Sequence, residues 1–184
     1  MTDKQIQRTK DEIKKIKAFL AAEKRKFGGY FDNRALRYVP TSLYVKIGDF
    51  AGGLRYLSWF RKNFPGDIGF PNFLFESTII FFENGKIKEA EKSALRTYCS
   101  NALVIDILLH PVNQNSHEDK RFYRKEDVPL TFIVWLEAFV NSQGFINAMQ
   151  KYNSLKEQLD LEPVGPRRSL LVEKLSRFED GEAL

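Results

Sequence analysis

The sequence predicts an all-α fold of stacked antiparallel helical hairpins with an N-terminal capping helix. A glycine-led phrase occurs twice between apolar stretches, as Gly48-Asp49-Phe50-Ala51-Gly52-Gly53-Leu54 and as Gly85-Lys86-Ile87-Lys88-Glu89-Ala90-Glu91. The copies start 37 residues apart, and each has a small residue, Gly53 or Ala90, five positions after its first glycine. Apolar residues recur at helical spacing, and strand-like alternation is lacking. Such recurrence is typical of stacked helical hairpins.

Length and composition favour one domain over residues 1–184. The chain is long enough for one core, and 43% hydrophobic residues argue against a disordered chain. The single cysteine, Cys99, excludes an intramolecular disulfide framework and lies on an apolar helical stripe, which favours a core role over a reactive thiol. The longest apolar run, residues 102–109, contains Asp106 and is too short to span a bilayer. A charged N-terminus without a secretory apolar stretch favours a cytoplasmic location.

The N-terminal segment, residues 1–29, is predicted to form a basic amphipathic helix. Ile6, Ile13, Ile16 and Leu20 recur at helical spacing. Thr2 and Gln5 have the spacing of a capping box, and Gly28-Gly29 ends the helix. We expect the apolar stripe to dock on the following helices, with the lysine and arginine side chains facing outward.

Positive charge is concentrated in residues 1–37, which carry eleven Lys or Arg and five Asp or Glu, whereas the remainder of the chain has a net charge of −1. The charge is interpreted either as a solvated helix face or as a surface for nucleic acid or another acidic partner. Adsorption to an anionic membrane is a lesser alternative. The residues predicted to form this basic patch are Lys14, Lys17, Lys24, Arg25, Lys26, Arg34 and Arg37.

Residues 34–110 are predicted to form two hairpins. Gly48-Asp49 and Asn84-Gly85 are their expected turns, and residues 101–110 continue as a further apolar helix. The segment 71–83 is apolar almost all round, which is typical of a helix covered on several sides. The four hairpin helices are expected at residues 40–47, 50–63, 71–83 and 86–100.

The C-terminal part is predicted to begin with a polar loop and to end in a capping helix. Residues 111–128 have no apolar period, and Asn113-Gln114-Asn115-Ser116 is the expected tip of the loop. Residues 129–184 are expected to form a third hairpin, from helices at 129–141 and 145–160, followed by a short helix that caps the stack.

The repeated phrases resemble tetratricopeptide repeats over roughly residues 34–102, with a fainter extension to about 160. Apolar residues, Phe50 and Ile87, follow each turn glycine by two positions, and Pro65 stands where a first repeat would end. The sequence departs from the family pattern in three ways. The tryptophan and the Leu-Gly pair of the first helix are missing, the second copy lacks the proline, and the 37-residue spacing exceeds the usual ~34. Another kind of helical hairpin bundle is the alternative.

The resemblance implies a peptide-binding groove lined by the first helix of each hairpin. The chaperone-binding subgroup needs Lys, Asn and Arg there to clamp a terminal carboxylate, and these are absent from the matching positions. An aromatic groove suits an apolar segment or a partner helix. Alternatively, Phe75, Ile79 and Phe82 are core residues covered by the N-terminal helix. The predicted groove residues are Tyr38, Ser42, Lys46, Asn72, Phe75, Ile79, Phe82 and Glu83.

No residue pattern indicates catalysis. His117, Glu118 and Asp119 lack the spacing of a metal site, and neither Gly28-Gly29 nor Gly52-Gly53 has the sequence of a phosphate loop. A nucleophile with a neighbouring base is not recognisable either. We therefore expect a non-enzymatic adaptor for a protein or peptide partner, without cofactor or metal. The alternative is a nucleic-acid-binding accessory protein that uses the basic N-terminal segment, and the oligomeric state is left open.

Overall fold

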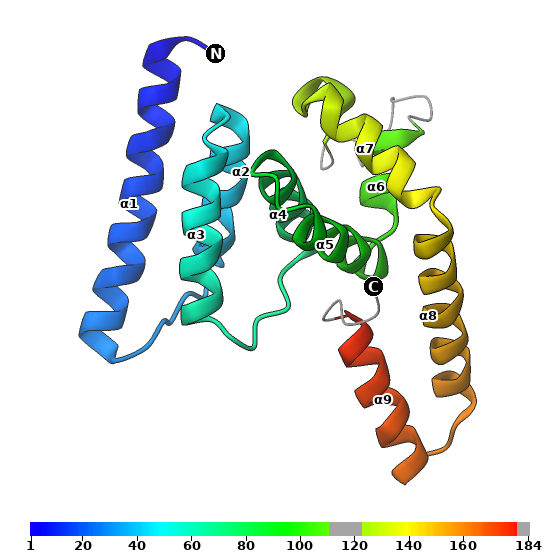
Figure 1. Ribbon diagram of the computed structural model, residues 1–184. Helices are drawn as coiled ribbons and strands as arrows, with labels where there is room; N and C mark the ends of the chain where they lie inside the picture. Colours follow the sequence, from blue (N-terminus) through cyan, green and yellow to red (C-terminus); the bar gives the residue numbers. More distant parts are fainter. Residues whose placement is uncertain (111–122, 180–184) are drawn as a thin grey trace.

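The computed structural model describes residues 1–110 and 123–179, which form α-helices and connecting turns with no strand among them (Figure 1). The prediction of an all-α protein is therefore confirmed. The predicted loop tip at 113–116 and the group His117, Glu118 and Asp119 lie outside the described residues. The α-helices of the described part are α1 (Asp3–Phe27), α2 (Val39–Ile47), α3 (Phe50–Asn63), α4 (Pro71–Glu83), α5 (Ile87–Ser100), α6 (Leu103–Leu109), α7 (Leu130–Val140), α8 (Gln143–Leu161) and α9 (Pro166–Glu179), and two short 3₁₀ helices are η1 (Leu36–Tyr38) and η3 (Lys125–Asp127).

Helix α1 lies at one edge of the molecule (Figure 1) and packs against α2 and η1. The predicted capping box is present, because Thr2 accepts from the Gln5 N–H while the Gln5 side chain accepts from the Thr2 N–H. Gly28 ends the helix with a φ of 73°, the left-handed conformation that glycine adopts without steric cost. The buried face carries Ile13, Ile16 and Leu20. Burying each of these side chains stabilises the docked helix by roughly 1.5–3 kcal/mol.

Helices α2 and α3 form the first pair, joined at Gly48 and Asp49. Gly48 has a φ of 68°, and the Asp49 carboxylate accepts the Gly52 N–H at 2.8 Å, which caps α3. The small residue Gly53 allows α3 to approach α4. A Cβ added there would lie only 2.8 Å from Cδ1 of Ile80. Even the methyl group of an alanine there would require the buried Ile80 side chain to shift.

Helices α4 and α5 form the most extensively packed pair. Gly85 turns the chain with a φ of 69°, and Ala90 is fully buried where the helices approach each other. Every residue from Phe73 to Phe81 is buried, so the expectation of a helix covered on several sides is confirmed. The Ser93 hydroxyl also donates to the Leu74 carbonyl at 2.9 Å, which links the two helices directly.

The third pairing differs from the prediction. Helix α8 lies alongside α9 at the edge opposite α1, whereas α7 runs at an angle to α8 (Figure 1). The ring centroids of Tyr152 on α8 and Phe178 on α9 are 5.7 Å apart. Helix α7 uses its own apolar face elsewhere, since Phe132 packs against Phe75 of α4 with a centroid distance of 5.8 Å. The sequence had instead predicted that the helix at 129–141 would pair with the helix at 145–160.

In the part of the chain that the structure describes, none of the helices has both the length and the apolar character needed to cross a bilayer.

Candidate functional site

Three of the predicted groove residues, Ser42, Lys46 and Asn72, line one pocket of about 620 Å³ between α2 and α4. The segment from Tyr123 to Asp127 closes its third side. We call this pocket the α2–α4 groove. Its full lining is Met1, Ser42, Val45, Lys46, Asn72, Glu76, Tyr123, Glu126 and Asp127. The volume lies within the range of roughly 300–1,000 Å³ that ligand pockets occupy.

Phe75 and Ile79 do not belong to an open groove, because both side chains are fully buried. The Phe75 ring packs against Tyr123 and Phe132, with centroid distances of 5.4 and 5.8 Å. Phe82 is half-buried and packs against Trp135 of α7 at 4.9 Å. The alternative that these residues are core therefore holds for Phe75 and Ile79. Phe75 is covered by Tyr123 and by Phe132 of α7, whereas the cover expected from the sequence was the N-terminal helix.

The remaining two predicted groove residues also lie outside the pocket lining. Tyr38 is half-buried in an aromatic cluster, with its ring 5.2 Å from that of Phe73, and its hydroxyl donates to Asp67. Glu83 is half-buried near the end of α4, and burial raises the pKa of its carboxyl. Of the predicted set, only Ser42, Lys46 and Asn72 are thus brought together in one pocket.

Glu76 forms the floor of the α2–α4 groove and is the chemically unusual group of the site. Its side chain is buried, with Oε2 hydrogen bonded to the Thr41 hydroxyl and Oε1 accepting the Tyr123 hydroxyl at 3.0 Å. Burial raises the pKa of Glu76 to about 7, although the hydrogen bonds from Thr41 and Tyr123 oppose the rise. Within residues 1–110 and 123–179, no cationic side chain forms an ion pair with this carboxyl.

The hydroxyl of Thr41 limits how Glu76 is protonated. Thr41 Oγ1 lies 2.8 Å from the Tyr38 carbonyl as well as within hydrogen-bond distance of Glu76. A threonine hydroxyl has one proton to donate. When that proton goes to the Tyr38 carbonyl, the Thr41 oxygen can only accept a hydrogen bond from Glu76, and Glu76 must then be protonated. In this orientation the Thr41 contact is compatible with the neutral acid, whereas a proton directed to Glu76 instead favours the carboxylate.

The rim of the α2–α4 groove is mainly acidic. Glu126 and Asp127 are exposed on η3, and Lys46 is exposed at the end of α2. With Glu76 ionised, the lining carries three carboxylates, against the ammonium of Lys46 and the α-amino group of Met1. Val45, which is almost fully buried, adds an apolar side chain to the lining. This arrangement suits a segment that presents a basic side chain beside a small apolar one.

The predicted basic patch is largely exposed along α1. Lys14, Lys17 and Arg25 are exposed, as is Arg34 in the following turn. Lys24 is exposed but donates to Asn63 Oδ1 at 2.8 Å and lies over the Tyr30 ring at 5.2 Å. The Lys26 ammonium lies 4.9 Å from the centroid of the exposed Phe27 ring. These six cations remain accessible to an acidic partner.

Arg37 does not belong to that patch, because its charge is used inside the protein. Its Nε donates to Asp67 Oδ2 at 2.7 Å, and a terminal nitrogen lies 3.2 Å from Asp32 Oδ2. Asp32 is almost fully buried and also accepts the N–H groups of Leu36 and Arg37 at 2.8 Å. Although burial opposes it, hydrogen bonds from Tyr38 and Arg37 lower the pKa of Asp67. Arg37 is therefore a structural residue of the turn that leads into α2.

Sequence reasoning did not find Glu76, Thr41 or Tyr123. Glu76 had one visible signal, since it is a lone acidic residue inside the apolar stretch from Phe73 to Phe82. A charged residue in such a stretch is seldom buried without a partner. Tyr123 gave no comparable signal in the sequence, because it lies in a polar segment without apolar period.

Metal binding finds no support in the described ranges, where no three His, Cys, Asp or Glu side chains are grouped to hold an ion. Comparisons of the chain with models of known protein families, with curated proteins and with solved structures gave no match.

Proposed function

We propose that the protein is a non-enzymatic interaction module that binds a segment of a partner protein in the α2–α4 groove. The observation that carries this proposal is the convergence of Ser42, Lys46 and Asn72 from two successive hairpins on one pocket with Glu76 at its floor. Glycine turns at positive φ and close helix crossings at Gly53 and Ala90 support a tetratricopeptide-like pairing. In such a pairing α2 and α4 are the first helices, whose surface binds peptides in the family that the sequence resembles.

The character of the pocket favours a polar partner segment with a basic side chain. Two of the apolar residues that had suggested an apolar ligand, Phe75 and Ile79, are fully buried. The accessible lining instead carries Glu126, Asp127 and Lys46 around Glu76. A lysine or arginine of the partner would face an excess of negative charge, with Val45 beside its alkyl stem.

Selection from a displayed library of random peptides, followed by fluorescence anisotropy on the selected peptides, tests this function. Ser42→Trp fills the pocket and should weaken binding about tenfold or more, a loss of about 1.4 kcal/mol. Ser58→Trp is the matched control, because Ser58 is an exposed serine of α3 that also donates to a backbone carbonyl of its own helix. Failure to select any peptide, or equal binding by both variants, would refute the proposal.

A second candidate function is nucleic-acid binding by α1. The specific observation is that Lys14, Lys17 and Lys24 are exposed at helical spacing on one side of α1, next to its buried stripe. An electrophoretic shift assay across a salt series tests it. Affinity that falls steeply with salt and disappears in the variant Lys24→Glu, Arg25→Glu, Lys26→Glu would support this function. Binding unchanged by those substitutions would exclude it.

A further inference from the structure

The end of α1 and the turn that follows it present two phenylalanine rings to solvent. Phe27 is 53% exposed and Phe31 is 60% exposed, and their ring centroids lie 5.2 Å apart. They lie where α1 ends, at a corner of the molecule (Figure 1). Single exposed apolar side chains are common on proteins, whereas exposed apolar side chains that lie together are typical of interaction sites.

Four cationic side chains flank these rings in the sequence, and all four are exposed. Among the described residues, none of the four forms an ion pair. The carboxylates of the same stretch are less accessible, since Glu23 is half-buried and Asp32 is almost fully buried against Arg37. The surface around the rings is therefore positively charged. The four cations are Lys24, Arg25 and Lys26 in the last turn of α1, and Arg34 in the following turn.

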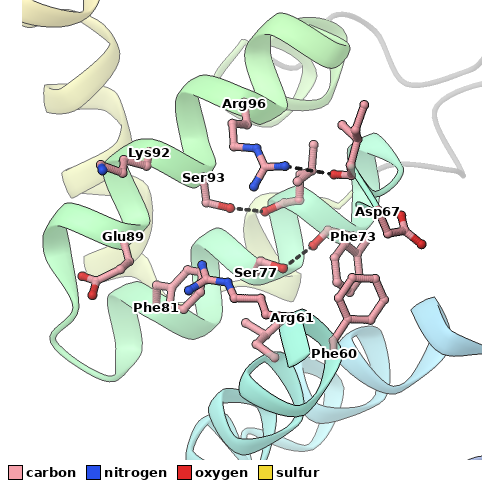
Figure 2. Close-up of a pocket in the computed structure, with 13 residues that line it drawn as sticks. Phe60, Arg61, Asp67, Phe73, Ser77, Phe81, Glu89, Lys92, Ser93 and Arg96 are labelled. Carbon is pink, nitrogen blue, oxygen red and sulfur yellow. Dashed lines mark hydrogen bonds between the residues drawn. The ribbon is translucent and has the colours of Figure 1, made fainter. Parts of the chain in front are cut away.

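The end of α3 brings a further exposed cation near this surface. Lys24 Nζ donates to Asn63 Oδ1 at 2.8 Å, which places the end of α1 beside the end of α3. Lys62, the residue before Asn63, is exposed. Arg61 is directed elsewhere, because it lines a cavity between α3 and α5 with its guanidinium 4.9 Å from the centroid of the Phe81 ring (Figure 2).

The dipole of α1 accounts for the cations but not for the rings. Lysine and arginine in the last turn of a helix interact favourably with its C-terminal end. The exposed rings gain nothing from the dipole and leave apolar surface in water. The apolar stripe of α1 cannot serve a membrane either, because Ile13, Ile16 and Leu20 are buried against the rest of the protein. An apolar contact with a membrane then requires the rings at the end of the helix.

We propose that this surface, the α1-end patch, binds the headgroup region of an anionic lipid bilayer. Phe27 and Phe31 insert among the headgroups, and the cations contact the phosphates and carboxylates of the lipids. Each lysine or arginine near an anionic bilayer strengthens binding about fivefold. Apolar insertion and charge attraction act together, as stable attachment at a bilayer surface requires. The α1-end patch consists of Lys24, Arg25, Lys26, Phe27, Phe31 and Arg34.

The orientation of the rings favours a bilayer over single-stranded nucleic acid, which is also bound by cations and aromatic side chains. Successive bases stack on the faces of aromatic rings. The planes of Phe27 and Phe31 are inclined at 75°, so the two rings do not offer parallel faces to neighbouring bases. The Lys26 ammonium also lies over the Phe27 ring, 4.9 Å from its centroid. Insertion among lipid headgroups needs no parallel alignment of the rings.

The α1-end patch is separate from the α2–α4 groove. Met1, at the other end of α1, is part of the groove lining. Helix α1 has 25 residues, which at 1.5 Å per residue gives a length of about 37 Å. A chain attached to a bilayer by the patch therefore keeps the groove open. Binding at both sites would bring a partner segment to an anionic membrane.

Co-sedimentation of the full chain with lipid vesicles tests the proposal. One set of vesicles is pure phosphatidylcholine, and in the other about one-third of the lipid is phosphatidylserine. The chain should bind the phosphatidylserine vesicles about tenfold or more tightly than the neutral ones, because several cations contribute. Equal binding to both sets, or no binding to either, would overturn the proposal.

The double variant Phe27→Ser, Phe31→Ser should weaken binding to the phosphatidylserine vesicles about tenfold or more. Both side chains are exposed, so their loss should not disturb folding. The matched control is Phe27→Leu, Phe31→Leu, which should stay within about threefold, because leucine enters a bilayer interface but does not stack on a base. Phe19→Ser removes another exposed ring of α1 and should change affinity less than about twofold.

Three results with these variants would contradict the α1-end patch. Equal weakening by the serine and leucine pairs would show that apolar insertion is not the source of affinity. A loss with Phe19→Ser as large as that of the serine pair would place the contact elsewhere on α1. Tighter binding to a single-stranded oligonucleotide than to the vesicles, abolished by the leucine pair, would assign the rings to nucleic acid instead.

Discussion

The hydroxyl of Tyr123 donates a 3.0 Å hydrogen bond to Oε1 of Glu76, a residue 47 positions earlier in the chain. This contact joins α4 to the segment that precedes α7, and the other carboxyl oxygen of Glu76 joins α4 to Thr41 of α2. One buried acid therefore connects three parts of the chain at the floor of the α2–α4 groove. Its protonation state affects both the stability of the fold and the charge that a partner meets.

The first prediction is a pH dependence of stability due to Glu76. Its pKa in the folded protein, about 7, lies above the ordinary value of 4.5, so the folded state holds the proton more tightly than the unfolded state. The resulting stabilisation is fully present below the unfolded pKa and is lost as pH rises through the folded pKa. Between pH 4.5 and 8 the loss should be on the order of 3 kcal/mol. Urea unfolding across this range measures it.

Glu76→Gln provides the comparison, because the amide is similar in size and does not titrate. The difference in free energy of unfolding between the wild type and this variant should change with pH in the direction just given. A constant difference between pH 4.5 and 8 would show that Glu76 does not titrate in that range.

The second prediction concerns Tyr123→Phe, which removes the hydroxyl donor from the buried carboxyl. The free energy of unfolding should fall by about 1–3 kcal/mol, and by more at pH 8 than at pH 5, because hydrogen bonds to ionised groups contribute more. Urea unfolding at the two pH values measures both. An equal loss of stability at pH 5 and at pH 8 would mean that the Tyr123 hydroxyl does not favour the ionised form of Glu76.

The third prediction tests the crossing of α4 and α5. Ala90 is fully buried, so Ala90→Leu should overpack the pair and cost about 1–3 kcal/mol. Ala51→Leu is the control, since Ala51 is exposed on the corresponding second helix, α3, and its change should stay within about 0.5 kcal/mol. Thermal unfolding distinguishes the two variants. If both melt like the parent, the repeat alignment at Ala90 is wrong.

The fourth prediction concerns Arg37, which lies between Asp32 and Asp67. Arg37→Gln leaves the almost fully buried Asp32 and the half-buried Asp67 without their cation, and we expect a loss of about 2–3 kcal/mol after allowing for partial exposure. Arg34→Gln, at an exposed position three residues earlier, should be nearly neutral. Chemical denaturation compares them. Equal stability of the two variants would contradict a structural role for Arg37.

Local signals in the sequence predicted the turns and small residues well. Gly28, Gly48 and Gly85 all adopt positive φ at helix ends, as their position at the ends of the predicted helices indicates. Ala90 is buried because the spacing from the turn glycine places it on the face that meets α4. These features depend on neighbours within a few residues, which is the distance over which helical period and capping are informative.

Contacts between distant segments could not be predicted in the same way. Apolar spacing indicates that Phe75 and Phe132 lie on buried faces, but it does not say that α7 packs on α4. Tyr56 on α3 is almost fully buried, and its hydroxyl donates to the Arg37 carbonyl at 2.6 Å, a partner 19 residues away that helical spacing does not indicate. Arg37 was likewise predicted to lie on the surface, because Asp67, whose carboxylate binds it, lies 30 residues away in the sequence.

The most direct test of partner binding in the α2–α4 groove is amide chemical-shift mapping of the full chain during titration with a peptide selected against it. The largest shifts should fall on Ser42, Lys46, Asn72 and Glu76, which line the pocket from two hairpins. The same titration on Ser42→Trp should lose those shifts. Shifts concentrated on α1 or on α8 and α9, with the pocket residues unchanged, would contradict the proposed site.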